Sequence, residues 1–191
     1  MSNNPSLPSE WEKQSYIQLT WPHTHTDWAY MLDEAEECFV SLATEIASRQ
    51  PLLLVAPEFP ETLNDFPYKD NLINRRLYDR HILNGEYINK RNFVLEGGSI
   101  ESDGKGTLLT TSSCLLAPNR NDTMSRHEIE AYLEETFNLR QVLWLDHGHL
   151  AGDDTDSHVD TLARLCPDDT ITYVRCDNRR DEHFSDLQAM E

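Results

Sequence analysis

Cysteine is scarce in this sequence, and no two cysteines form a Cys-x-x-Cys pair. The four cysteines lie far apart, at Cys38, Cys114, Cys166 and Cys176. This spacing signals neither a disulfide framework nor a zinc knuckle, so we expect reduced and mostly buried thiols.

Long apolar runs are absent too, and the first residues, Met1–Pro5, are not a basic segment followed by an apolar stretch. The sequence therefore predicts neither a membrane span nor a secretory leader. We expect a cytoplasmic protein that has no membrane partner.

Basic residues are outnumbered, because 16 Lys and Arg face 34 Asp and Glu, and the formal net charge is -18. The acids gather towards both ends, in residues 1–66 and 141–191. Such a surface repels nucleic acid and attracts a small cation, although a charge that serves only solubility explains it equally well. With 191 residues, 38% of them hydrophobic, the chain is long enough for one globular domain with a core of its own.

The hydrophobic pattern predicts strands mixed with helices, as in an α+β fold, without a sequence repeat of fixed period. The expected strands are residues 15–21, 51–56, 92–96, 99–102, 107–116, 141–145, 158–165 and 170–175. The expected helices are residues 26–46, 71–82 and one that begins at the capping box of Ser125 and includes 129–137. A connector with three prolines at 57–68 separates a first strand–helix–strand unit from the rest.

The densest group of ionisable side chains is Gly152–Asp160, which holds four acids and one histidine in nine residues. Like charges at this density repel one another unless a cation lies nearby, so we interpret the segment as a site. On a strand, His158 and Asp160 would project from the same face, because strand side chains alternate. Asp154 would lie within reach of that face.

A second candidate is Glu96, which precedes Gly97 and Gly98, where missing side chains allow a ligand or another segment to approach. An imidazole beside carboxylates tends to stay protonated, which suits a general acid or a proton shuttle. Carboxylates bind a guanidinium in a bidentate manner, so a planar cation is the expected partner.

Two other interpretations stay open at this point. The acids of the turn can simply satisfy backbone N–H groups, with His158 an ordinary sheet histidine. Alternatively, Asp and His side chains can ligate a metal, although no second histidine cluster or octahedral oxygen loop completes such a set. We predict no metal and no cofactor.

Several motifs follow one another along the chain. They are Trp21-Pro22-His23, Leu95–Gly104, Leu108–Thr111, Leu115–Asn121 and Gly152–Asp160. Together they resemble the agmatine deiminase and Porphyromonas-type peptidylarginine deiminase family, over most of the chain except about 57–70. The resemblance implies the pentein fold, here a partial α/β propeller of ββαβ-like modules. It also implies a hydrolase that converts a guanidine to a ureido group with release of ammonia, such as agmatine to N-carbamoylputrescine in polyamine biosynthesis.

The resemblance also implies a role for each site residue. His158 would shuttle protons, and Glu96 would be the carboxylate that orients the histidine. Asp160 would hold the guanidinium of a small cationic substrate such as agmatine, and Asp154 is a further substrate-side candidate.

Two elements of the family pattern are not found in this sequence: a Trp-x-Arg-Asp stretch before Glu96, and a Gly-rich His-Cys segment that carries the nucleophile. We therefore expect one incomplete deiminase-family domain over 1–191, with an internal gap near 61–70 and a missing carboxy-terminal part. Neither Cys114 nor Cys166 has a basic neighbour to lower its pKa, so little or no turnover is expected. The alternatives are a non-catalytic remnant that binds a guanidinium or associates, for example as a homo-oligomer, through exposed strand edges, and a natural protein with further segments.

Overall fold

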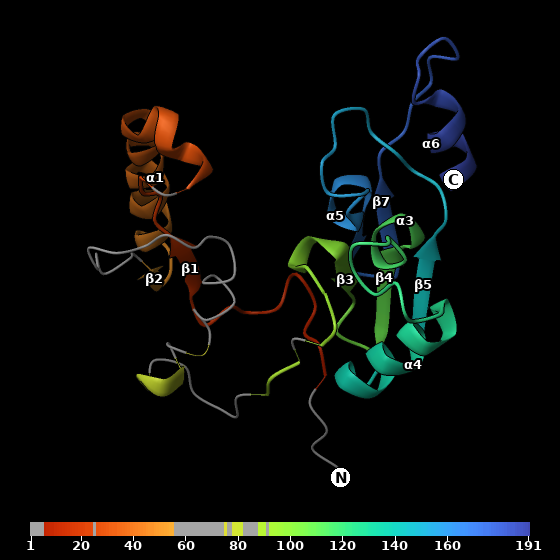
Figure 1. The fold of residues 1–191 in the computed structure, drawn as a ribbon, viewed down its shortest axis with the longest axis horizontal. Coiled ribbons are helices and arrows are strands. Elements are labelled where there is room, and N and C mark those ends of the chain that lie inside the picture. The colour runs from red at the N-terminus through yellow and green to blue at the C-terminus, as the bar shows by residue number, and fades with distance from the viewer. Residues whose placement is uncertain (1–5, 25, 56–74, 76–77, 82–87, 91) are drawn as a thin grey trace. The chain divides into compact units, whose positions relative to one another are not determined.

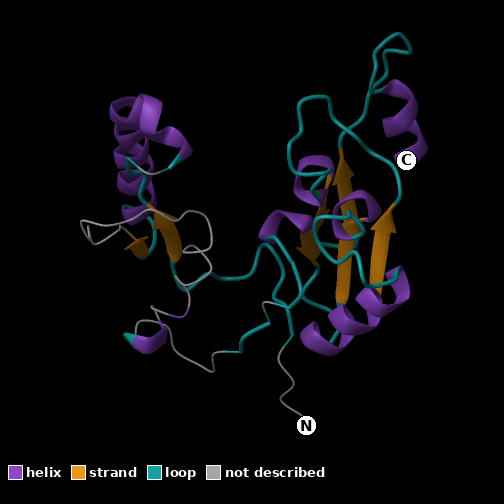
Figure 2. Cartoon of the chain, in the orientation of Figure 1, coloured by secondary structure: helices purple, strands orange, loops and turns teal. Residues whose placement is uncertain are grey.

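The computed structural model describes the chain except residues 1–5, 25, 56–74, 76–77, 82–87 and 91 (Figure 1). The predicted connector and most of the predicted helix at 71–82 lie outside the described residues. The chain divides into two compact units, Lys13–Asn89 and Met1–Glu12 with Lys90–Glu191. Each unit mixes helices with strands, as Figure 2 shows, so the predicted mixed α and β character is confirmed.

The unit Lys13–Asn89 contains the predicted strand–helix–strand arrangement. Its elements are β1 (Ile17–Thr20), the 3-10 helix η1 (Asp27–Met31), α1 (Leu32–Ala47) and β2 (Leu52–Val55). The two strands are parallel, with Ile17 opposite Leu52, and parallel neighbours need a crossover, which η1 and α1 supply. Within the described part of the chain, no helix is both long and apolar enough to span a bilayer.

The other unit carries the candidate site. Its elements are η3 (Gly97–Ser99), β3 (Ile100–Ser102), β4 (Thr107–Thr111), α3 (Ser112–Leu115), α4 (Arg126–Phe137), β5 (Gln141–Leu145), α5 (Val159–Leu162), β6 (Ala163–Cys166), β7 (Thr170–Tyr173) and α6 (Phe184–Met190). Strand β4 is antiparallel to β3 and parallel to β5 (Figure 1). Apart from the four-residue helix α3, the chain order here is strand, strand, helix, strand, in β3, β4, α4 and β5. Strands β6 and β7 form a separate antiparallel pair.

Strand β4 is the centre of this unit, because every one of its residues is buried. Leu108 packs in one cluster with Ile129 and Leu133 of α4, whereas Leu109 packs in another with Val159 of α5. Successive strand residues face opposite sides of a sheet, so α4 and α5 cover opposite faces of β4. The candidate site lies just beyond the carboxyl end of β4, where the chain enters α3 and where Thr111 bonds the segment that precedes α5.

Three predicted elements differ in the structure. Residues 92–96 are not a strand, because the side-chain amide of Asn121 pairs with both backbone groups of Val94 at 3.0 Å. The strand predicted at 107–116 ends at Thr111, whose side chain accepts a hydrogen bond from the Cys114 N–H and caps helix α3.

The strand predicted at 158–165 is wrong in its first half. Residues Val159–Leu162 are the short helix α5, and only Ala163–Cys166 form a strand. The apolar pattern allows both structures: Val159 and Leu162 are buried three residues apart, as in a helix, and Ala163 and Leu165 are buried two apart, as in a strand. Strand alternation therefore does not pair His158 with Asp160.

Candidate active site

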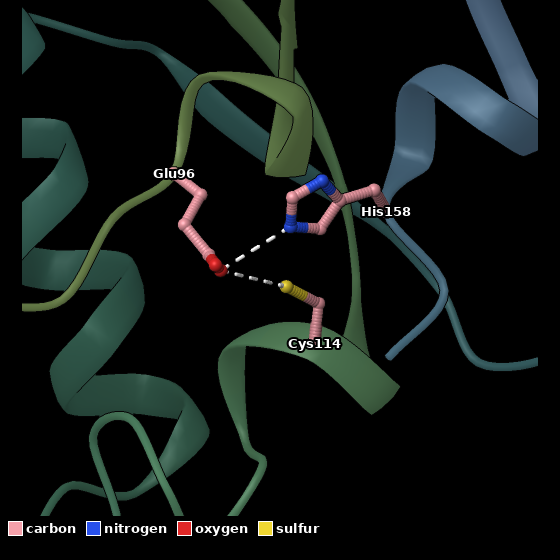
Figure 3. Close-up of side chains that lie close together, drawn as sticks. All are labelled: Glu96, Cys114 and His158. Carbon is pink, nitrogen blue, oxygen red and sulfur yellow. Dashed lines mark hydrogen bonds and ion pairs between the residues drawn. The ribbon is translucent and has the colours of Figure 1, made fainter. Parts of the chain in front are cut away.

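Glu96 and His158 come together in space although 62 residues separate them in sequence. Glu96 is the residue before η3, and His158 is the residue before α5. The Oε2 atom of Glu96 lies 3.2 Å from Nε2 of His158, and the His158 side chain is only 13% exposed (Figure 3). Buried Val159 anchors α5 in the core, so the backbone of His158, the preceding residue, is held in place.

Gly98 lies directly against His158 and Asp160. A Cβ atom at this position would come within 2.6 Å of Nδ1 of His158 and 2.7 Å of Oδ2 of Asp160. The imidazole and the carboxylate therefore meet at one glycine, by a turn into α5 rather than by strand alternation. The glycine is required here by close approach of these side chains, whereas a Cβ atom added at Gly97 would have nothing within 4 Å.

A guanidinium from within the chain, that of Arg120, completes the site. Its Nε donates to Oε2 of Glu96 at 2.6 Å, its Nη1 donates to Oδ2 of Asp156 at 2.5 Å, and its Nη2 donates to the Thr155 carbonyl at 3.1 Å. The side chain of Arg120 is only 6% exposed. This is the cation that the acid-dense segment requires.

The acid-dense turn has an unusual backbone. Asp156 and Ser157 both have positive φ, at 59° and 61°, a conformation that costs about 1–2 kcal/mol for each residue other than glycine. Asp153 offsets this cost, since its carboxylate accepts from the backbone N–H groups of Thr155 at 3.1 Å and Ser157 at 2.7 Å. The Thr111 hydroxyl, at the end of β4, donates to the Ser157 carbonyl at 2.7 Å.

These contacts set the protonation of the acids. The hydrogen bond from Arg120 outweighs burial, which acts to raise the pKa, and with a smaller contribution from His158 it holds the pKa of the Glu96 carboxyl below its usual range. The same guanidinium lowers the pKa of Asp156. For Asp153, burial acts to raise the pKa, but the hydrogen bonds from Thr155 and Ser157 outweigh it and the pKa is lowered. An ionised Glu96 can only accept, so Nε2 of His158 carries the proton in their hydrogen bond.

Cys114, on α3, lies beside Glu96 and His158. Its Sγ is 3.9 Å from Oε2 of Glu96, and the residue is fully buried (Figure 3). Burial raises the pKa of the Cys114 thiol to about 11, despite the opposing charge of Arg120. A thiol with this pKa is a poor nucleophile at neutral pH.

The ligand atoms of Glu96, Cys114 and His158 all lie within 4.8 Å of one another. Carboxylate, thiolate and imidazole are ligands that zinc accepts. Two features oppose a cation here: the Arg120 guanidinium already occupies Glu96, and the Cys114 thiol resists ionisation. The geometry therefore suits acid–base chemistry better than metal binding.

The structure thus brings together three of the four predicted site residues, Glu96, His158 and Asp160. Asp154 is exposed on the turn, where its neighbours Asp153 and Asp156 make the inward bonds. Asp153 accepts hydrogen bonds from backbone N–H groups, which is one of the roles that the sequence left open for the acids of this turn. Sequence reasoning missed Arg120, although the requirement for a cation near these acids was the signal that could have found it.

Comparison with known proteins gives a consistent result. A family model, Porphyromonas-type peptidyl-arginine deiminase, matches residues 6–66 and 62–191. The agmatine deiminase of Stutzerimonas stutzeri is 29% identical over 96% of this chain and 64% of its own length. A provisionally named agmatine deiminase of Photobacterium profundum is 29% identical over 93% of this chain and 62% of its own length. The chain therefore spans less than two thirds of these curated relatives.

Solved structures agree in fold. An agmatine deiminase variant of C. jejuni with substrate bound has a TM-score of 0.84 and 31% identity, over 97% of this chain and 69% of that one. A protein of Porphyromonas gingivalis provisionally named arginine deiminase has a TM-score of 0.81 and 43% identity, over 96% and 69% of the two chains.

Proposed function

Because the chain belongs to the Porphyromonas-type peptidyl-arginine deiminase family, we propose that Glu96, His158 and Asp160 are the acid–base and guanidinium-binding part of a site that hydrolyses guanidines. The observation that carries the proposal is the meeting of Glu96 and His158 at 3.2 Å, with Asp160 beside His158 at Gly98. Agmatine is the substrate we propose, because several relatives are named agmatine deiminase and one solved relative holds its substrate.

Each residue has a role that its contacts support. Asp160 is exposed and can accept two N–H groups of a planar guanidinium. His158 would move a proton to the departing ammonia and take one from the water that replaces it. Glu96, which Arg120 keeps ionised, would hold the His158 ring in the orientation needed for both transfers. Asp154 remains a proposed substrate-side residue.

The complete reaction needs a thiolate that attacks the guanidinium carbon, and Cys114 is a poor candidate because it is fully buried and its pKa is about 11. We therefore propose that the 191-residue chain alone binds a guanidine but turns it over little or not at all. The match of the family model in two overlapping pieces, 6–66 and 62–191, supports a shortened central region. So does the alignment with the Photobacterium protein, whose 231 positions exceed the 191 residues of this chain.

The proposed fold is more specific than the mixed α and β architecture. We propose one deiminase-family domain, built as a partial propeller of ββαβ modules. The run of β3, β4, α4 and β5, with an antiparallel pair followed by a parallel neighbour, supports one such module.

Calorimetry with agmatine tests the binding step, and a ureido-product assay tests turnover. We expect wild-type protein to bind agmatine and Asp160→Asn to lose at least about tenfold in affinity, since a charged hydrogen bond is removed. Robust ureido product that disappears in Cys114→Ala would refute the proposed inactivity. Absence of agmatine binding by the folded wild-type chain would refute the proposed site.

A second candidate function is association, which the exposed strand β7 favours. All four of its residues are exposed, including Ile171 at 45% and Tyr173 at 47%. Exposed apolar residues on an edge strand promote pairing with another chain. Sedimentation should then show an oligomer that Ile171→Lys dissociates, and a wild-type monomer at high concentration would exclude this function.

A further inference from the structure

Arg120 joins the two segments from which the acid–base pair comes. Glu96 lies 24 residues before it, and the acceptors on the turn, Thr155 and Asp156, lie 35 and 36 residues after it. All three guanidinium nitrogens of this 6% exposed side chain are used, each on a different acceptor residue. A guanidinium has the planar, forked shape needed to bridge acceptors on two segments.

Each end of the bridge fixes one partner of the pair. At one end, Glu96 is 45% exposed and would otherwise be free to rotate, so its bond to Arg120 decides where Oε2 lies. At the other end, the bonds to Thr155 and Asp156 hold the turn whose positive-φ residues aim the chain into His158. The Thr155 hydroxyl then accepts the His158 backbone N–H at 3.1 Å, so the held turn reaches the histidine directly.

We infer that Arg120 is the positioning residue of the site: it holds the Glu96 carboxylate on Nε2 of His158 and fixes the turn that presents His158. It acts through these two residues and not on a substrate. The inference deepens the proposed function, because the importance of the pair for catalysis rests on that function. The placement itself does not, and it can be measured without substrate.

A guanidinium could instead serve only overall stability. The two roles differ in what they predict for the ring of His158. Positioning requires that loss of Arg120 frees Glu96 from His158, so that the Nε2-protonated form loses its preference. A merely structural role lowers the stability of the whole unit and leaves the ring form of the folded molecules unchanged.

The test uses the full chain in three variants, Arg120→Gln, Arg120→Lys and the control Arg164→Gln. Arg164 is a matched control, because its Nε also bonds a carboxylate, that of Glu101, at 2.6 Å and Glu101 is 1% exposed. Long-range proton–nitrogen NMR spectra report the ring form of His158, carbon NMR reports the titration of the Glu96 carboxyl, and amide exchange reports the turn.

In Arg120→Gln we expect a mixture of ring forms and a Glu96 titration that moves up towards the ordinary glutamate range. We also expect the exchange of the Ser157 amide to accelerate, relative to wild type, by at least about tenfold more than the exchange of the amides in α4. Arg164→Gln should keep wild-type values for all three. Arg120→Lys keeps the charge without the fork, so Glu96 should titrate below its position in Arg120→Gln while the Ser157 amide still exchanges about tenfold faster than in the wild type.

Wild-type ring form and Ser157 exchange in folded Arg120→Gln would overturn the inference. If Arg120→Gln does not fold, Arg120→Lys decides, because wild-type exchange at Ser157 in that variant would show that the fork has no positioning role. Failure of agmatine binding, by contrast, would count against the proposed function alone.

Discussion

Replacement of Gly98 by alanine is expected to push apart the residues that we place at the centre of the site. The added Cβ would lie 2.6 Å from Nδ1 of His158 and 2.7 Å from Oδ2 of Asp160, whereas ordinary contacts begin at 3.4 Å. Each group must therefore withdraw by roughly 0.7–0.8 Å. Such a shift of His158 would carry Nε2 to about 4 Å from Glu96 if it points away from that residue, beyond hydrogen-bond reach.

Gly98→Ala should lower both the free energy of unfolding and the affinity for agmatine, for different reasons. Overpacking typically costs about 1–3 kcal/mol, and the change from glycine to alanine returns about 0.4–1 kcal/mol through the unfolded chain. We therefore expect Gly98→Ala to lose about 1–2 kcal/mol of unfolding free energy in urea. Asp160 is exposed and can rotate away at little cost to stability, but its carboxylate then leaves the site, so agmatine affinity should fall by at least about tenfold.

Gly97→Ala is the matched control, because the same methyl group meets nothing within 4 Å one residue earlier. We expect it to equal or slightly exceed the wild type in stability and to leave agmatine affinity unchanged. If Gly98→Ala and Gly97→Ala behave alike in both measurements, the close packing of His158 and Asp160 on Gly98 is wrong.

Three further predictions concern the thiols and one helix cap. Unfolded Cys114 has a pKa near 9.0 and folded Cys114 has a pKa of about 11, so the unfolded state loses its proton first and stability falls as pH rises between these values, by up to about 3 kcal/mol. The unfolding free energies of wild type and Cys114→Ala, measured in urea, should therefore diverge from about pH 8 to pH 11, and a parallel pH dependence would contradict the burial of the thiol. At about pH 8 a thiol reagent should label Cys38, which is exposed, at least about a hundredfold faster than Cys114, and equal rates in folded protein would show that Cys114 is accessible. Ser125→Ala should cost about 1 kcal/mol by urea unfolding, because the Ser125 hydroxyl accepts the Glu128 N–H in a complete capping box, and an unchanged midpoint would rule out a contribution of the cap.

The elements that the sequence predicts well are those with a strong local signal. The capping box at Ser125 and the apolar positions Ile129 and Leu133 predict helix α4, and the structure has its first residue at Arg126. The turn at 103–106 predicts the hairpin of β3 and β4 in the same way, since hairpin register depends on nearby residues.

The elements that the sequence does not determine depend on distant contacts. Whether Val159–Leu162 is helix or strand is ambiguous in the apolar pattern, and packing of Val159 against Leu109 of β4 and the bend at Ser157 accompany the helix. The sequence pattern likewise predicts a strand at Val94, but in the structure the side chain of Asn121, 27 residues later, binds the backbone groups of Val94.

The candidate site shows the same division. Glu96, His158 and Asp160 could be named in advance because the motifs that contain them imply a role for each. Arg120 also stands in a motif, Leu115–Asn121, but no role was assigned to it, because that role comes from bonds to residues 24 and 36 positions away. The density of acids at 152–160 predicted that a cation must be near, without indicating which of the 16 basic residues supplies it.

We propose that Glu96, His158 and Asp160 form a guanidinium site, and an NMR titration of the His158 ring shows whether a guanidinium binds there. Agmatine should shift the ring signals of His158 in a saturable manner, and putrescine, which carries an amine in place of the guanidine, should shift them much less. Asp160→Asn should weaken the agmatine response by at least about tenfold. A guanidinium site at these residues would be contradicted by His158 signals that do not respond to agmatine. It would also be contradicted by signals that respond equally to agmatine and putrescine, in wild type and in Asp160→Asn alike.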